Sequence, residues 1–154
     1  MTSRCLSRRF GSLELTLEFA HGTNALVSVR FPDEPPAPLN ALDVREALVA
    51  LQCLPIPPPR SAADLLFRSA LASVPPGETR TYGQIARTLG TSPRAIGARC
   101  AANPLLLRIP CHRIVAANGP GGFRAGLSWK NTLLELERHR GVFPTVSDLS
   151  PRLF

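Results

Sequence analysis

The sequence lacks any long run of apolar residues, and no stretch of its 154 residues approaches the ~20 needed to cross a bilayer. Its four cysteines, Cys5, Cys53, Cys100 and Cys111, have no CxxC spacing, which argues against a zinc site and a disulfide framework. Residues 1–11 carry arginines, but no apolar segment follows them as in an export signal. We therefore expect a soluble cytoplasmic protein with reduced thiols, no metal, no cofactor and no membrane contact.

Acidic residues are scarce in the C-terminal half. Residues 79–140 contain nine arginines and one lysine against two glutamates, whereas residues 1–78 contain seven arginines against eight acids. The first of these segments therefore has an excess of +8, ten basic minus two acidic side chains. A GC-rich genome would explain the preference for arginine over lysine, but it does not explain this segregation. A local excess of this kind suits a phosphate-binding surface, so the composition favours nucleic acid as a partner.

The N-terminal third has the pattern of a hairpin covered by a helix. Residues 13–19 alternate apolar and polar side chains, and after a turn residues 25–31 are again rich in β-forming residues. Apolar residues then recur at helical spacing over residues 40–53, before a proline run ends this part. The chain is long enough for one domain with a small appendage. We expect an abbreviated N-terminal α/β domain over residues 1–59 and a second domain over residues 60–154.

Three helix-start patterns follow. Ser61 with Asp64 three residues later resembles a capping box and predicts a helix through Val74. The segment 81–84, Thr-Tyr-Gly-Gln, predicts a second helix in the same way, closed by Gly90. Ser92 before a proline predicts a third, over residues 94–102.

The last two of these helices, separated by a tight turn, suggest a helix-turn-helix. The second helix carries arginines beside small residues that would let its backbone approach another surface closely. Small residues in a helix also indicate tight helix packing, and helix-turn-helix patterns are weak signals by themselves. The candidate DNA contacts on this helix are Arg94, Ala95, Gly97 and Arg99.

A thiol and an imidazole stand side by side in the apolar segment 109–115. Pro110 fixes the backbone before Cys111, which predicts a thiol held at a defined depth. A free cysteine is little ionised at neutral pH, and the neighbouring His112 and Arg113 are candidates to promote the thiolate. The alternative is a buried core thiol beside a chance histidine.

A final helix is predicted from Ser128 as its cap to Gly141 as its stop. Two glutamates on this helix are the only acids of the basic half. A buried glutamate that reached His112 would orient its imidazole. The alternative for Glu137 is a solvated helix face beside Arg138.

Taken together, these motifs resemble the O6-alkylguanine-DNA alkyltransferase family, whose members remove alkyl groups from guanine and are used once. The resemblance covers roughly residues 62 to 141 in the family's order and spacing. It rests on Gly77-Glu78, Thr81-Tyr82-Gly83-Gln84-Ile85-Ala86, Arg94-Ala95-Ile96-Gly97, Asn103-Pro104, Pro110-Cys111-His112-Arg113, Gly126-Leu127, Lys130, Leu133-Leu134 and Glu137. It implies a ribonuclease-H-like α/β N-terminal domain and a mainly helical C-terminal domain, an α+β fold overall.

The resemblance also implies a reaction. Cys111 would accept the alkyl group permanently, with His112 as its base through a water and Glu137 as the orienter of the imidazole. Tyr82 would press on the DNA backbone and supply a proton toward guanine N3. Arg94 would fill the stack vacated by the flipped nucleotide. The same resemblance places Asn103, Pro110, Ile114, Phe123 and Arg124 at the substrate pocket, with Asn103 as the hinge to the recognition helix.

We therefore expect a single-turnover methylated-DNA–protein-cysteine S-methyltransferase, a DNA repair enzyme that acts as a monomer on double-stranded DNA containing O6-alkylguanine and is associated with the nucleoid. Three alternatives remain: an alkyltransferase-like protein that binds the lesion without transfer, a helix-turn-helix transcription factor with an incidental thiol, and a Cys-His hydrolase. Alkyltransferase-like proteins replace the acceptor cysteine, which Cys111 retains here. Phe123 stands where the family often has tyrosine, Arg124 where serine is common, and Ala125 where a glycine is usual.

Overall fold

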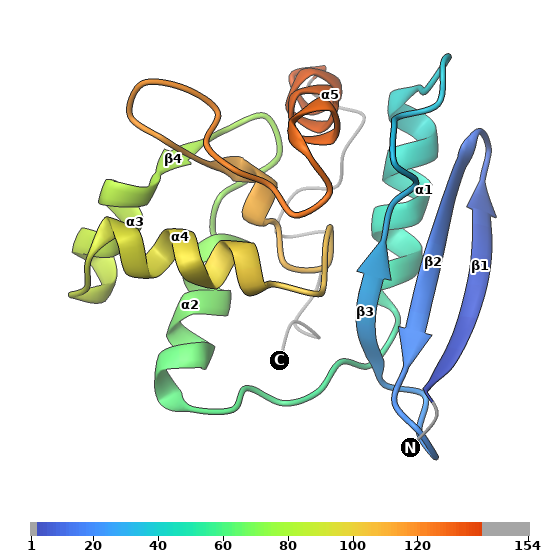
Figure 1. Cartoon of the computed structure of the whole chain (residues 1–154), viewed down its shortest axis with the longest axis horizontal. Helices are drawn as coiled ribbons and strands as arrows, with labels where there is room; N and C mark the ends of the chain where they lie inside the picture. Colours follow the sequence, from blue (N-terminus) through green and yellow to red (C-terminus); the bar gives the residue numbers. More distant parts are fainter. Residues whose placement is uncertain (1–2, 140–154) are drawn as a thin grey trace.

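The computed structural model describes residues 3–139, and within that range a small sheet lies beside a group of helices (Figure 1). The sheet is an antiparallel meander of β1 (Arg4–Phe10), β2 (Leu13–Phe19) and β3 (Leu26–Arg30), in that spatial order. In β2 every second residue from Leu13 to Phe19 is buried, which confirms the predicted alternation. Strand β1 was missed because six of its seven residues are exposed and give no apolar pattern.

Helix α1 (Ala41–Gln52) packs beside the sheet and confirms the predicted helix. Its N-cap, Asn40, accepts a hydrogen bond from the backbone N–H of Asp43. One face of the helix is buried, with Val44, Ala47, Leu48 and Leu51 among the core residues, whereas Leu42 and Val49 are exposed.

The C-terminal part contains four α-helices within the described range: α2 (Ala62–Ala72), α3 (Tyr82–Leu89), α4 (Pro93–Ala102) and α5 (Leu127–Glu137). Two short strands, β4 (Arg80–Thr81) and β5 (Ile114–Val115), pair in parallel, and the 3-10 turn η1 (Cys111–Arg113) precedes β5. The mixed α/β class is thereby confirmed.

Two of the predicted helix starts hold in full, and two differ. Thr81 and Gln84 form a reciprocal capping box, and Ser92 caps α4. Ser61 also caps its helix, but the carboxylate three residues later accepts from the N–H of Arg60 rather than from that of Ser61. The prediction that Ser128 caps the last helix was wrong, because α5 begins one residue earlier behind Gly126, without a side-chain cap. The predicted stop at residue 141 lies outside the described residues.

Polar contacts join the sheet to the helical part. The backbone N–H of Val29 in β3 donates to the carbonyl of Pro104 at 2.8 Å. The Trp129 indole of α5 donates to the Pro32 carbonyl at 2.6 Å, and its ring lies 4.5 Å from that of Phe31. The loop after α4 and helix α5 are therefore both held against the N-terminal part. Among residues 3–139, no helix is long and apolar enough to span a bilayer.

Candidate functional site

The Cys111 thiol is held in place by the side chain of Asn103, the C-cap of α4. The Asn103 amide nitrogen donates to the Ile109 carbonyl at 3.1 Å and to Cys111 Sγ at 3.2 Å. The Asn103 amide oxygen accepts from the N–H of Leu105 at 3.0 Å. Asn103 is itself buried, and Cys111 is only 3% exposed. The end of the predicted recognition helix and the thiol are therefore joined by one side chain.

A hydrogen-bonded cluster lies directly behind the thiol. His112 Nε2 lies 2.8 Å from Glu137 Oε1, and both side chains are fully buried. Arg113 donates to both oxygens of the same carboxylate, at 2.9 and 2.8 Å, and also to the Val74 carbonyl. The solvated-face alternative for Glu137 is therefore wrong, and so is the idea that Arg113 acts on the thiol. Its guanidinium is committed to Glu137 and Val74.

The charge on Glu137 decides the tautomer of His112. Burial by itself would raise the pKa of Glu137, but the neighbouring His112 and Arg113 outweigh it and lower the value to about 2. An ionised carboxylate only accepts hydrogen bonds, so the proton of a neutral His112 ring is on Nε2. His112 Nδ1 is buried and has no hydrogen-bond partner among residues 3–139. That nitrogen therefore carries a free lone pair and can take up a proton.

The thiol is protonated in the resting protein. Burial raises the pKa of Cys111, while the hydrogen bond from Asn103 and the positive charge of Lys130 oppose that rise in part. Because a thiolate is the nucleophilic form, the site needs a base to remove the proton. The unpartnered His112 Nδ1 is the candidate for this base.

A buried lysine closes the other side of the site. Lys130 Nζ donates to the carbonyls of Ile114 and Gly122, at 2.6 and 2.9 Å, and lies 5.8 Å from the centre of the Tyr82 ring. Burial lowers the pKa of Lys130, and the two nearby thiols, of Cys111 and Cys100, act in the opposite direction. Lys130 was predicted only as part of a motif and was assigned no role. Its position in the sequence does not indicate that its side chain is buried.

Tyr82, at the start of α3, reaches the loop that leads to α5. Its hydroxyl donates to the Gly122 carbonyl at 3.4 Å. The loop can approach this closely only because residue 121 is glycine: a Cβ there would lie 2.8 Å from the Tyr82 ring. Burial, and then the Cys100 and Cys111 thiols, raise the pKa of Tyr82, so its hydroxyl stays protonated at neutral pH.

The other residues predicted for the pocket have different environments. The Phe123 ring lies 6.2 Å from that of His112, and Ile114 is fully buried in β5. Pro110 is the residue before η1. Arg124 is exposed, and its guanidinium donates to the Ala102 carbonyl at the end of α4, at 3.5 Å.

Helix α4 is the second helix of the predicted helix-turn-helix, and its arginines differ. Helix α3 ends at Gly90 in the left-handed conformation, and α4 begins at Pro93, so the turn is tight. Arg94 is exposed and has no hydrogen-bond partner among residues 3–139, and a Cβ on Gly97 would meet open space. Arg99 instead donates to the Ala63 carbonyl of α2 at 2.8 Å. DNA contacts by Arg94, Ala95, Gly97 and Arg99 stay predictions.

No group of three or more His, Cys, Asp or Glu side chains suited to a metal lies among the described residues. Fold and site together define the class of protein: a mixed α/β protein in which one buried cysteine stands beside a histidine ordered by a carboxylate. Residues 66–139 match the family model described as the DNA-binding domain of 6-O-methylguanine DNA methyltransferase. Just under half of the chain is therefore similar to this alkyltransferase family.

Named relatives show a similarity to the same family. The methylated-DNA–protein-cysteine methyltransferase of Saccharolobus islandicus strain L.S.2.15 is 56% identical over 64 residues, 42% of this chain and 42% of that protein. The protein of the same name from Metallosphaera sedula is 57% identical over 61 residues, 40% and 39% of the two chains. The alignments therefore span less than half of the curated relatives.

Similarity to solved structures extends over more of the chain. The O6-methylguanine methyltransferase of Mycobacterium tuberculosis has a TM-score of 0.66 and 28% identity, covering 91% of this chain and 95% of that one. A structure of M. tuberculosis OGT in complex with DNA has a TM-score of 0.64 and 27% identity, covering 97% and 99%. The fold similarity thus includes the N-terminal sheet as well as the region matched by the family model.

Proposed function

We propose that this protein repairs DNA directly, by transferring an alkyl group from the O6 atom of guanine to Cys111. The observation that carries the proposal is the buried Cys111 thiol beside an imidazole whose free nitrogen is set by an ionised Glu137. The family match over residues 66–139 and the names of the relatives support the same chemistry.

The transfer is a substitution at the alkyl carbon. The thiol proton passes to His112 Nδ1, directly or through a water, and the imidazolium formed is stabilised by the Glu137 carboxylate. The Cys111 sulfur then donates an electron pair to the alkyl carbon, and the bond from that carbon to O6 breaks. Its electron pair stays with the guanine, which becomes a better leaving group if it is protonated at the same time.

Tyr82 is the proposed donor of that proton, toward guanine N3. Its raised pKa keeps the hydroxyl protonated at neutral pH, and its contact with Gly122 places it at the rim of the site. The imidazolium of His112 then loses its proton to solvent, and the Tyr82 phenolate takes up a proton from solvent, so that both residues return to their starting state. The net change is that the alkyl group replaces the thiol hydrogen, and that hydrogen ends on guanine. The thioether on Cys111 is not hydrolysed, so each molecule reacts once.

Access to a base inside a duplex requires that the nucleotide be flipped out, at a cost of a few kcal/mol. The exposed Arg94, near the start of α4, is the proposed filler of the vacated stack. The basic excess of residues 79–140 would provide affinity for the phosphates that is independent of sequence. The residues proposed to line the substrate pocket are Asn103, Pro110, Ile114, Phe123 and Arg124.

Mass spectrometry after mixing with duplex DNA that contains O6-methylguanine tests the proposal. One added methyl group, ~14 Da, is expected on the peptide that contains Cys111, with one equivalent transferred per protein molecule. Cys111→Ser should abolish transfer and retain DNA binding, whereas Cys53→Ser, at an exposed thiol, should react as the unmodified protein does. Repeated turnover would indicate a hydrolase, and DNA binding without any label would indicate a transcription factor or a lesion-binding protein.

The finer organisation is proposed on the same basis. We infer an N-terminal ribonuclease-H-like unit over residues 1–59 and a C-terminal alkyltransferase unit over residues 60–154. The substrate would be O6-alkylguanine in double-stranded DNA, bound by a monomer that is associated with the nucleoid in the cytoplasm. Limited proteolysis within the proline-rich connection, followed by a transfer assay of the purified fragments, tests the boundary.

A further inference from the structure

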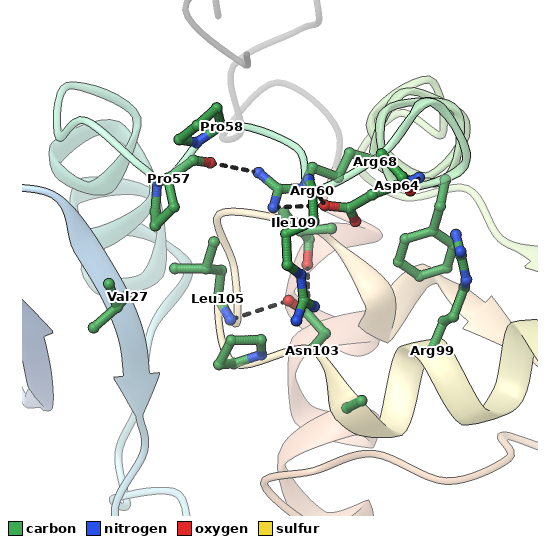
Figure 2. Close-up of a pocket in the computed structure, with 14 residues that line it drawn as sticks. Val27, Pro57, Pro58, Arg60, Asp64, Arg68, Arg99, Asn103, Leu105 and Ile109 are labelled. Carbon is green, nitrogen blue, oxygen red and sulfur yellow. Dashed lines mark hydrogen bonds and ion pairs between the residues drawn. The ribbon is translucent and has the colours of Figure 1, made fainter. Parts of the chain in front are cut away.

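A cavity of about 430 Å³ lies where β3 and the proline-rich connection face α2 and the loop after α4 (Figure 2). We call it the rear pocket, and its walls run from Pro57 to Arg60, along one side of α2, and from Arg99 to Ile109. Its volume lies in the range of about 300–1,000 Å³ typical of ligand sites. Cys111, His112 and Tyr82 are not among the residues that line it, so the proposed reacting groups lie outside it, and Asn103, which is also assigned to the substrate pocket, is shared by the two.

The polar wall of the rear pocket is positively charged. It contains Arg60, Arg68 and Arg99 against one carboxylate, Asp64, which leaves two positive charges in excess. Arg68 spans the wall, since it donates to the Pro57 carbonyl at 2.8 Å and to Asp64 at 3.0 Å (Figure 2). The Asp64 carboxylate also accepts from the backbone N–H of Arg60. The guanidinium of Arg60 makes no hydrogen bond to any residue in the 3–139 range, so its donors are available to an anion.

The remaining lining is apolar, and the Arg99 side chain of the polar wall adds a flat cation. Pro57, Pro58, Leu105 and Ile109 provide rings and aliphatic carbons. The guanidinium of Arg99 lies over a phenyl ring of α2, 5.4 Å from its centre, which fixes the guanidinium plane. Such a plane can stack on a nucleobase. A ligand with a flat ring and a doubly charged anion therefore matches both kinds of wall.

We propose that the rear pocket binds small phosphate monoesters that carry a flat ring, the chemistry of a nucleoside monophosphate. The phosphate dianion would meet the donors of Arg60 and the positive excess of the polar wall. The ring would lie between the Arg99 plane and the proline side of the cavity. A free carboxylate, with one negative charge, fits the excess less well.

Occupancy of the rear pocket is coupled to the thiol. Asn103 and Ile109 line the pocket, and the Asn103 amide nitrogen joins the Ile109 carbonyl to Cys111 Sγ. A ligand packed against these two residues restricts the movement of the Asn103 side chain. The hydrogen bond to the thiol is then held more firmly, and the reactivity of Cys111 changes.

Calorimetric titration of the full chain with deoxyadenosine monophosphate tests the binding. Arg60→Glu reverses the free charge but keeps the backbone N–H that Asp64 accepts, so it should weaken binding by about tenfold or more. The matched control is Arg45→Glu, an exposed arginine on α1, which should bind as the unmodified chain does. A thermal melt checks that both variants fold. If Arg60→Glu does not fold, Arg60→Gln is titrated in its place. Equal affinity in both variants would overturn the proposal.

Two further titrations identify the chemistry of the ligand and the location of its binding site. Inorganic phosphate and deoxyadenosine should each bind more weakly than the nucleotide, and phosphate that binds as tightly would reduce the site to an adventitious ion only. The titration is then repeated with the protein saturated with unmodified duplex DNA. Unchanged nucleotide affinity supports a separate pocket, whereas mutual exclusion would assign these residues to the DNA surface and overturn the proposal.

The coupling has its own measurement, which uses no alkylated DNA and so does not depend on the proposed function. The rate of carbamidomethylation of Cys111 by iodoacetamide is followed by peptide mass, with and without the nucleotide. A several-fold change is expected in the unmodified chain and none in Arg60→Glu. Binding without any change in this rate would retain the site but refute its link to Cys111 through Asn103.

Discussion

Replacement of Glu137 by glutamine tests the central arrangement of the site. The carboxylate of Glu137 meets His112 on one oxygen and Arg113 on both, and all of these contacts are buried. Glutamine keeps the shape and one acceptor oxygen but removes the negative charge. It also brings an NH₂ group close to the guanidinium of Arg113, where only acceptors are suited.

The expected loss of stability is large for a single substitution. Removing one partner of a buried ion pair costs about 3–5 kcal/mol, since the charge of Arg113 stays buried without its counter-charge. The free energy of unfolding of an ordinary domain is about 5–15 kcal/mol. The Glu137→Gln variant should therefore still fold, but unfold at a clearly lower urea concentration. Adding Arg113→Met should restore part of the loss, because it removes the orphaned charge.

Urea denaturation at pH 7 measures this loss, and the same helix offers a control. Glu135 is 63% exposed at its side chain and pairs with Arg138, which is 71% exposed. Glu135→Gln should therefore cost less than about 1 kcal/mol. The buried cluster does not stabilise the fold as expected if Glu137→Gln lowers the free energy of unfolding no more than Glu135→Gln does. The same conclusion follows if Arg113→Met lowers the stability of the Glu137→Gln variant as much as it lowers that of the unmodified chain.

The pH dependence of stability gives an independent estimate of the same energy. Glu137 has a pKa of about 2 in the folded protein against an ordinary value of 4.5, so the folded state binds this proton less readily than the unfolded state. The stabilisation is complete above pH 4.5 and is lost as the pH falls toward 2. A shift of that size corresponds to roughly 3 kcal/mol. Glu137→Gln should lack this component of the acid dependence, whereas Glu135→Gln should retain it.

Three further changes have expected outcomes. Arg94→Ala should slow transfer from duplex DNA far more than from the free alkylated base, because only the duplex requires a filled stack; equal slowing in single-turnover assays would exclude that role. Asn103→Ala should cost about 1–3 kcal/mol in urea denaturation and change the iodoacetamide rate of Cys111, since it removes the hydrogen bond to the thiol; an unchanged rate would argue against Asn103 as its support. Methylation of Cys111 should lower the melting temperature and weaken DNA binding, because an added methyl group overpacks a buried site and costs about 1–3 kcal/mol of stability. An unchanged melting temperature together with unchanged DNA affinity would contradict this expectation.

Features marked by a local pattern were predictable from the sequence. The alternation of β2, the capping box at Thr81 and the proline after Ser92 each depend on neighbours in the chain, and the structure has all three. The cysteine–histidine segment was also identifiable, because the residues before and after it are apolar. In these segments, interactions between residues close in the sequence are sufficient to determine the structure.

Features that depend on distant partners were not predictable. Strand β1 is exposed on nearly every residue and forms through backbone pairing with β2, which leaves no apolar signature. The link from Arg113 to Glu137 joins positions 24 apart in the sequence, and nothing in either neighbourhood indicates it. The depth of Lys130 likewise follows from carbonyls that the fold brings to it. In each case the deciding contact exists only after the chain has folded.

The raised pKa of the thiol has a consequence for the proposed single reaction of Cys111. An exposed thiolate would be consumed by oxidants and by alkylating agents in solution, since reactivity follows thiolate character and exposure. Burial keeps Cys111 protonated, and the base that would ionise it, His112 Nδ1, is enclosed with it. Under the proposed function, the thiol would be spared until a flipped base occupies the site and presents its alkyl carbon at bonding distance. Protection and reactivity thus come from the same enclosure, because the substrate alone brings the electrophile inside.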